Sequence, residues 1–314
     1  MNSTTIRFVS MGLVLFSSCA VLALESTARA AALFPGHAVI GETVAETLQR
    51  ASRWSSASGL SDGIQVAVMP GFAEAMGAIN ATEVALIEGV VTSAFEAWAN
   101  PALQFDITFD GAAVIDSSLG FEFDLFALPE SSFVFGPDPP FGSASVFDQF
   151  ILSRPLTNGQ VFDGWAIAGA DVYINIDKTA AFADLFSLTE EEKLASLGRL
   201  LMHEIGHGLG LHHSNVATLT NYDTDNDPLN AMAIDPLDPF ANVISSSFRD
   251  TNAIMSNDAE FSSLFQTFLS NDDLGGRDLL YPVVPEPNTM FLACIGATVV
   301  VGWQLRRRRQ RKRQ

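Results

Sequence analysis

Residues 203–213 read His203-Glu204-Ile205-Gly206-His207-Gly208-Leu209-Gly210-Leu211-His212-His213, the pattern H-E-x-x-H-x-x-G-x-x-H. His203 and His207 are four residues apart, so a helix places both imidazoles on one face, where they can hold one ion. Glycine at position 210 allows a sharp turn out of the helix, which brings His213 back as a third ligand. Three imidazoles leave one position for water, as in catalytic rather than structural zinc sites, and Glu204 can hydrogen-bond that water.

Four of the five histidines of the chain lie in this segment. The spacing after Gly210 selects His213 as the ligand, which leaves His212 at the rim. A bare H-E-x-x-H occurs by chance in many helices, but the added glycine and third histidine favour a metal site. The fifth histidine, His37, is interpreted as solvated, and contact with the metal in a latent form is the alternative.

The first 30 residues predict export. Arg7, an apolar run from Phe8 to Leu24 and the sequence Ala28-Arg29-Ala30 are typical of a secretory signal peptide with its cleavage site. An uncleaved anchor is disfavoured because the run is short and a cleavage site follows it. A lipoprotein signal at Cys19 is disfavoured because Phe16-Ser17-Ser18 match poorly and Cys19 lies inside the apolar run.

The last residues, 283–314, have three parts. Val284-Pro285-Glu286-Pro287 is followed by an apolar stretch over 289–305 and by a basic cluster over 306–313. The apolar stretch is near the lower length limit for a transmembrane segment, and the basic cluster would stay cytoplasmic. This order resembles the PEP-CTERM sorting signal of Gram-negative bacteria. The resemblance implies processing by an exosortase-type membrane protease and an envelope protein that is anchored and then becomes surface-bound or extracellular; a plain anchor is the alternative.

The body of the chain is strongly acidic. Residues 31–287 keep 8 of the 17 basic residues and 35 of the 36 acidic ones, a formal charge of −27 against −19 for the whole chain. This charge argues against nucleic acid and anionic membrane surfaces as partners, and it is compatible with bound calcium. Cys19 and Cys294 both lie in the terminal segments, so no disulfide staples the body. The roughly 250 remaining residues are enough for one sizeable core.

Hydrophobic periodicity predicts the elements around the motif. Alternation of apolar and polar residues predicts strands, and apolar residues repeated at helical spacing predict helices. The expected strands are Ile64–Met69, Leu103–Phe109 and Trp165–Ile176, and the expected helices are Asn80–Ala99, one that begins after a Thr189/Glu192 capping box and continues into the histidines, and Asp272–Leu280. Residues 111–150 are rich in Phe, Gly, Pro and Asp, so strands and long loops are expected there without defined bounds.

Several of these segments together resemble the metzincin metalloproteases, and within them the matrixins. The resemblance is carried by Ala94–Trp98 and Leu103–Phe105 (first helix and second strand), Gly169–Ile174 (the edge strand above the cleft), Leu211–Ser214 (the end of the zinc motif), Ala253-Ile254-Met255-Ser256 (the Met-turn) and Ser270–Gly275 with Leu280-Tyr281 (the closing helix).

The resemblance implies an α+β, zincin-like catalytic domain with a twisted, mostly parallel sheet above the cleft and an active-site helix below it. It implies a secreted or surface zinc endopeptidase that acts on protein or peptide substrates. His203, His207 and His213 would bind zinc, Glu204 would be the catalytic general base, and Met255 would be the structural floor of the Met-turn.

Departures from the matrixin pattern change some expectations. The body has no cysteine for cysteine-based latency, and it lacks the histidines of a second zinc site, so one zinc ion is expected. The 41 residues between His213 and Met255 are long for the group. They contain Asp223-Thr224-Asp225-Asn226-Asp227-Pro228, where calcium is possible, but a solvated acidic loop is favoured because Pro228 stands where a calcium loop has glycine and Ile234 where it has glutamate.

The expected organisation is a signal peptide (1–30), a lead-in or short pro-segment (31–62), a matrixin-like domain (63–282) and the sorting signal with its transmembrane segment (283–314). A second interpretation of function is a non-catalytic structural or interaction protein of the extracellular matrix that keeps the zinc fold. The sorting signal and the acidic body motivate it. A third is that the protein processes itself or neighbouring sorted proteins.

Overall fold

The computed structural model describes residues 31–33, 51–54, 63–111, 122–133, 140–155, 161–213, 221–223, 242–246, 253–256 and 265–283. His37, residues 224–228 of the possible calcium loop and the apolar stretch 289–305 lie outside this part of the chain. Within the described residues, no helix combines the length and the apolar content needed to cross a membrane.

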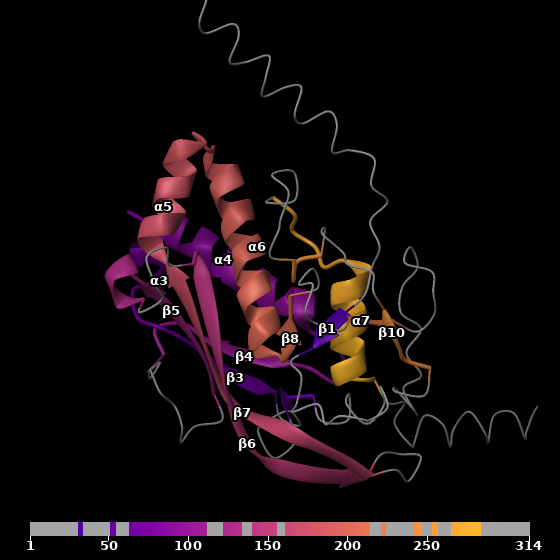
Figure 1. The fold of residues 1–314 in the computed structure, drawn as a ribbon. Coiled ribbons are helices and arrows are strands. Elements are labelled where there is room, and N and C mark those ends of the chain that lie inside the picture. The colour runs from indigo at the N-terminus through magenta and orange to yellow at the C-terminus, as the bar shows by residue number, and fades with distance from the viewer. Residues whose placement is uncertain are drawn as a thin grey trace, which may run out of the picture.

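Groups of strands and groups of helices follow one another along the chain (Figure 1). The strands are β1 (Ala31–Leu33), β2 (Arg53–Trp54), β3 (Ile64–Val68), β4 (Phe105–Thr108), β5 (Glu122–Leu128), β6 (Gly142–Pro155), β7 (Val161–Asn175), β8 (Leu211–His212), β9 (Asn221–Asp223) and β10 (Ile244–Ser246). The helices are α3 (Phe72–Ala75), α4 (Ala81–Trp98), the 3-10 helix η2 (Glu130–Ser132), α5 (Ile176–Leu185), α6 (Glu190–Gly208) and α7 (Asn271–Leu280). The predicted helices correspond to α4, α6 and α7, and the predicted strands to β3, β4 and β7.

The main sheet has the strand order β2-β7-β5-β3-β4, with β6 added beside β7. Strands β2, β7, β5, β3 and β4 pair in parallel, and β6 pairs antiparallel with β7. The expectation of a mixed α/β fold with a mostly parallel sheet is therefore confirmed. A second, antiparallel sheet has the order β10-β9-β1-β8 and contains His212.

One strand assignment from the sequence is wrong. Gly169–Ile174 was expected at the sheet edge above the cleft, but it belongs to β7, which has β5 and β2 on one side and β6 on the other. The edge strand is β6. The physical reason is burial on both faces: Ala170, Asp171 and Val172 are consecutive and all 0% exposed, which only an interior strand allows.

Local capping explains where the two long helices begin. The side chain of Asn80 accepts hydrogen bonds from the amides of Thr82 and Glu83 at the start of α4. Thr189 and Glu192 form a full capping box at the start of α6, as the sequence predicts. Each cap satisfies backbone donors that have no partner inside the helix.

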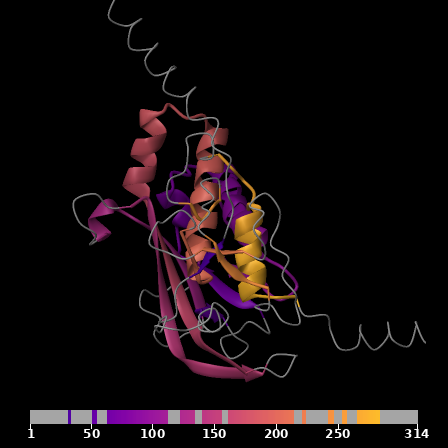
Figure 2. The same cartoon turned by 45° about the vertical axis from the view of Figure 1, so that its right-hand side comes forward.

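The helices α4 and α6 pack on one face of the sheet through aromatic side chains. Phe95 of α4 meets Phe123 of β5 edge-on, with ring centroids 5.2 Å apart. Trp98 of α4 is fully buried and donates from Nε1 to the carbonyl of Met202 in α6 (2.9 Å). In both views α6 lies between the sheet and α7 (Figure 1, Figure 2). The helix that carries the histidines is thus held from several sides, which makes it a rigid support.

Candidate metal centre

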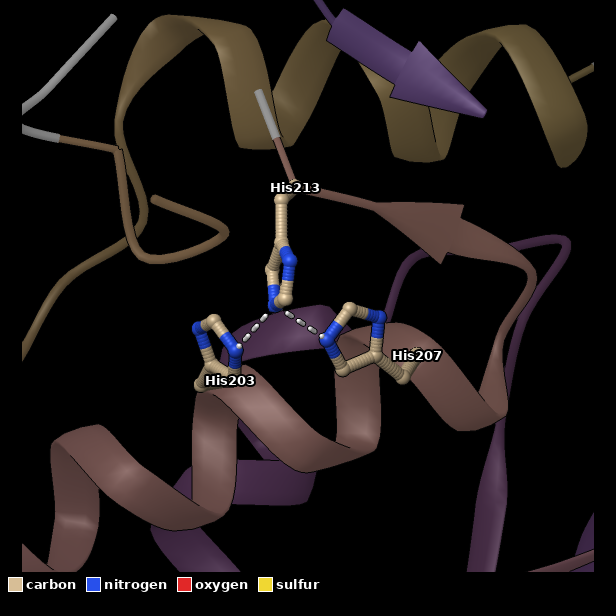
Figure 3. A group of neighbouring side chains, drawn as sticks. All are labelled: His203, His207 and His213. Atoms are coloured by element: carbon tan, nitrogen blue, oxygen red, sulfur yellow. Dashed lines mark hydrogen bonds between the residues drawn. The ribbon is translucent and has the colours of Figure 1, made fainter. Parts of the chain in front are cut away.

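Three imidazoles converge on one point (Figure 3). His213 Nε2 lies 3.1 Å from His203 Nε2 and 3.0 Å from His207 Nε2. His203 and His207 come from successive turns of α6, and His213 comes from the segment that follows β8. The geometry expected from the H-E-x-x-H spacing is present, and the three ligand atoms lie within 4.8 Å of one another.

Backbone carbonyls set the tautomers of two of these rings. His203 Nδ1 lies 2.6 Å from the carbonyl oxygen of Ile254, and His207 Nδ1 lies 2.9 Å from that of Leu211. A carbonyl only accepts, so Nδ1 must carry the proton in both rings and donate it. In the neutral rings Nε2 then carries the lone pair, and in both rings this atom lies next to His213 Nε2. This is the arrangement by which proteins orient histidine ligands for a metal ion.

The spacing and the protonation states fit a divalent ion. Zinc–nitrogen bonds of about 2.0–2.1 Å at tetrahedral angles hold ligand nitrogens roughly 3.3–3.4 Å apart, close to the distances found here. Burial lowers the pKa of His203 to about 3. Burial, followed by the neighbouring His203 and His213, also holds the pKa of His207 well below its usual value. Both rings are therefore neutral at pH 7 and ready to act as ligands.

A brace at the C-terminus of α6 turns the chain toward His213. Gly210 has φ +97°, in the left-handed region, and a Cβ there would overlap the carbonyl oxygen of Ser52. Trp54 Nε1 donates to the carbonyl of Gly208 (3.0 Å), and the Tyr281 hydroxyl donates to that of Leu209 (2.7 Å). We call residues 52–54 together with Tyr281 the brace. It satisfies the last helix carbonyls and fixes the exit of the chain, so glycine is required at position 210.

Residues 51–54 fall within the segment that the sequence assigns to a lead-in. Trp54 is 0% exposed, and β2 pairs with β7 in the main sheet. The hydroxyl of Tyr281 also accepts from the backbone amide of Trp54 (3.2 Å). These residues therefore pack as part of the fold around the histidines, whereas the division of the chain at residues 62 and 63 stays a prediction.

Glu204 lines the same cavity as the three histidines. It is 5% exposed, and its carboxylate has no hydrogen-bond partner within the described part of the chain. Burial raises its pKa to about 8. The start of β6 covers it closely: a Cβ on Gly142 would lie 2.8 Å from Glu204 Cγ and Oε1. A buried carboxyl group with a raised pKa beside a metal site is suited to proton transfer near neutral pH.

Met255 lies directly against α6, the helix that carries His203 and His207. It is 3% exposed, and a Cβ on Gly206 would overlap its sulfur atom. Residues 253–256 form a turn in which the amide of Ser256 donates to the carbonyl of Ala253 (3.0 Å). We call these four residues the methionine turn. Its Ile254 carbonyl is the one that orients His203, so the turn supports the centre through both packing and hydrogen bonding.

Two side chains from elsewhere hold the methionine turn. The carboxylate of Asp273 in α7 accepts from the amides of Ile254 (2.8 Å) and Met255 (3.1 Å). Arg199 of α6 donates from Nη2 to the carbonyl of Ala253 (3.4 Å). Sequence reasoning did not identify either residue. The signal for Asp273 was its place three residues after Ser270 in a capping box, whereas nothing local marks Arg199.

The histidines open into a cavity of about 670 Å³, within the usual range for binding sites. It is bounded by the start of β6, by α5, by the histidine-bearing face of α6, by His212 and by Ser256. His212 is partly exposed at this rim, as expected, and its Nδ1 accepts from the amide of His213 (2.7 Å). The structure thus brings together Glu204, His203, His207 and His213, all the residues that the motif singled out, with Met255 behind the helix.

The fold and the centre define a mixed α/β protein with a three-histidine candidate metal site. Residues 283–309 match the family model of the PEP-CTERM protein-sorting motif. This confirms the sorting signal predicted from the tail, and it marks an exported, envelope-targeted protein of Gram-negative bacteria that an exosortase-type processing enzyme recognises.

Two further comparisons add no functional information. No curated protein matches the chain. Among solved structures, a chain of the "GM1 bound form of the ECX AB5 holotoxin" aligns with a TM-score of 0.35 and 15% identity, over 76% of this chain and 91% of that chain. A likeness this weak carries no argument about fold or activity.

Proposed function

We propose that the protein is a secreted or surface zinc-dependent endopeptidase of the metzincin type, with matrixin-like features. The observation that carries the proposal is the convergence of the Nε2 atoms of three imidazoles beside a cavity that also contains Glu204. The antiparallel edge strand β6 over this cavity and the methionine turn beneath α6 support the same assignment.

His203, His207 and His213 would hold one zinc ion. When bound, zinc polarises the scissile carbonyl and lowers the pKa of its water to about 7. Glu204 would take a proton from the attacking water and later deliver it to the leaving amine. Its burial favours the neutral carboxylic acid after the first transfer, which suits it to hand the proton on.

The strand β6 would align the substrate. Among the described strands β7 is the only partner of β6, so β6 has one edge that pairs with no described strand, and Gly142, Ser143 and Ala144 at its start line the cavity. An extended peptide can add to such an edge through main-chain hydrogen bonds, which bind many sequences in one orientation. The close approach of Gly142 to Glu204 would place the peptide backbone next to the general base.

A comparison of two substitutions tests the proposal. Glu204→Ala is expected to keep the metal and lose proteolysis, whereas His207→Ala is expected to lose the metal. Zinc content by elemental analysis and cleavage of a random peptide library by the full-length protein are the two measurements. Glu190→Gln is a matched control, because Glu190 is on the same helix but its side chain is 85% exposed. Cleavage by the wild type that does not exceed that of Glu204→Ala would refute the enzymatic proposal.

The sorting motif favours one alternative, a non-catalytic structural or interaction protein of the cell surface or extracellular matrix. In that case the metal would only stabilise the fold. The same two proteins separate the peptidase from the structural role. If zinc raises the unfolding temperature of the wild type and of Glu204→Ala equally, and neither protein cleaves peptides, the structural role is supported.

A further inference from the structure

The cavity continues away from the three histidines along α6. Beyond His203 it is lined by Leu200, Arg199 and Ser196, and by Phe182 of α5, which lies beside α6 (Figure 1). With a rise of about 1.5 Å per residue, Arg199 is roughly 6 Å and Ser196 roughly 10 Å from His203 along the helix axis. We call this part of the cavity the side pocket. It is deep enough for a side chain adjacent to the reacting bond.

Arg199 has too few hydrogen-bond partners for a buried guanidinium. It is 7% exposed, yet within the described part of the chain its one hydrogen bond is the long contact from Nη2 to the Ala253 carbonyl, and Nε is buried without a partner there. A guanidinium carries five N–H donors. The carboxylate of Asp273 acts on it only through space: its oxygens accept from backbone amides, and the ion pairs among the described residues do not include it.

Ser256 is the second buried polar group at this pocket. It is 1% exposed, its amide is used by the methionine turn, and its hydroxyl oxygen is buried with no hydrogen-bond partner among the described residues. Ser256 and Arg199 contact the same carbonyl, that of Ala253, so the hydroxyl and the guanidinium belong to one corner of the cavity. Buried donors without partners are unfavourable, and a ligand that accepts from them would remove that penalty.

We propose that the side pocket binds an acidic side chain of the substrate, glutamate above all, with its carboxylate on Arg199 and Ser256. This rests on the proposed peptidase function and assigns its specificity. Phe182 and Leu200 suit the methylenes of the side chain, and the guanidinium accepts a carboxylate in a two-pronged geometry. Arg199 is displaced by roughly 6 Å from His203 along the helix axis, and the longer glutamate side chain spans this distance better than aspartate does.

Binding is tested first without catalysis. Zinc-loaded full-length Glu204→Ala is titrated by calorimetry with synthetic octapeptides of alanine and glycine that carry one glutamate, glutamine, leucine or lysine, moved through the four central positions. At one position we expect the glutamate peptide to bind about 10- to 150-fold more tightly than the leucine peptide, the range for a hydrogen bond to a charged group. Lysine at that position should bind most weakly.

Variants identify the residues responsible. Arg199→Met in the Glu204→Ala background should reduce the glutamate-to-leucine ratio to about one, and Ser256→Ala should reduce it severalfold. Arg199→Lys keeps the charge but not the planar fork, so an intermediate ratio is expected. If Arg199→Met does not fold, as judged by its zinc content and unfolding midpoint, the glutamate-to-leucine ratios of Arg199→Lys and Ser256→Ala test the assignment instead. An unchanged ratio in the variants would overturn the assignment.

Cleavage of the same peptides by the wild type separates this proposal from the peptidase function. Glutamate preference in binding without cleavage supports the pocket and refutes the enzyme. Cleavage that favours leucine as much as glutamate refutes the pocket and leaves the enzyme. If the peptides show neither a glutamate preference in binding nor any cleavage, both the pocket and the peptidase function are refuted. A purely structural Arg199, which only holds the methionine turn, would change stability in Arg199→Met without changing the glutamate-to-leucine ratio.

Discussion

Substitution of Asp273 by alanine should damage the metal centre without touching a ligand. Its carboxylate accepts from the amides of Ile254, Met255 and Ser270, and Ile254 is the residue whose carbonyl orients His203. The methionine turn is held on one side by this carboxylate and on the other by the single long bond from Arg199. Removal of the carboxylate should therefore loosen the turn and the ring of His203 together.

The size of the effect follows from burial. Ile254 is 0% and Met255 3% exposed, so their amides have no water to replace the carboxylate. Each unsatisfied buried donor costs about 1–3 kcal/mol, and loss of the cap at Ser270 adds about 1 kcal/mol. Burial also raises the pKa of Asp273, so its removal relieves some desolvation of the charge. The expected loss in the free energy of unfolding is about 2–5 kcal/mol. Zinc affinity should fall about 10- to 100-fold, as for other groups that orient a ligand.

The assay is urea unfolding of the metal-free protein together with zinc titration against a competing chelator. Asp278→Asn on the same helix is the control, because Asp278 is 40% exposed and its ion pair with Arg277 should contribute less than about 1 kcal/mol. If Asp273→Ala unfolds like Asp278→Asn and binds zinc as tightly as the wild type, the carboxylate does not hold the turn and the reasoning fails.

Three other perturbations have defined outcomes. Gly210→Ala should lower the free energy of unfolding by about 2–4 kcal/mol and weaken zinc binding, because φ is +97° and the new methyl group overlaps Ser52; wild-type values in urea unfolding and zinc titration would contradict this. Gly142→Val should keep the zinc content but reduce kcat at least about tenfold, because its side chain would displace Glu204; full peptide turnover would count against the role of that carboxylate. Glu204→Gln should change the pH dependence of the metal-free protein. The folded pKa of Glu204 is about 8 and its ordinary value is 4.5, so the protonated acid stabilises the fold fully below pH 4.5 and this stabilisation is lost as the pH rises toward 8. Relative to the glutamine variant, the wild type should lose about 3–4 kcal/mol between pH 5 and 8 in urea unfolding with chelator, and a constant difference would show that Glu204 is not buried as described.

The convergence of the three histidines was predictable because it is local. His203, His207 and the turn at Gly210 lie within eleven residues, and helical spacing with a glycine stop determines how they are presented. The long helices were predictable for a similar reason, because their capping residues and apolar positions lie close together in the sequence. Strand β7 alternates clearly enough to be recognised as a strand, although its position in the sheet was assigned wrongly.

The remaining features depend on distant partners. The Ile254 carbonyl that sets the tautomer of His203 is 51 positions away, and the brace joins residues separated by 227 positions. Such pairings leave no periodic signal in a single sequence. The burial of Ala170, Asp171 and Val172, which marks β7 as an interior strand, is visible only in the structure, and the weak pattern over residues 111–150 did not define the edge strand β6.

The brace joins two parts of the chain that are synthesised at very different times. Trp54 is among the first residues of the body to leave the ribosome, and Tyr281 is among the last. A chain that crosses the membrane with its N-terminus leading therefore delivers His203 and His207 before the contact that fixes the bend to His213 can form. The three histidines would therefore be fixed in their final arrangement only after the segment that carries Tyr281 has crossed.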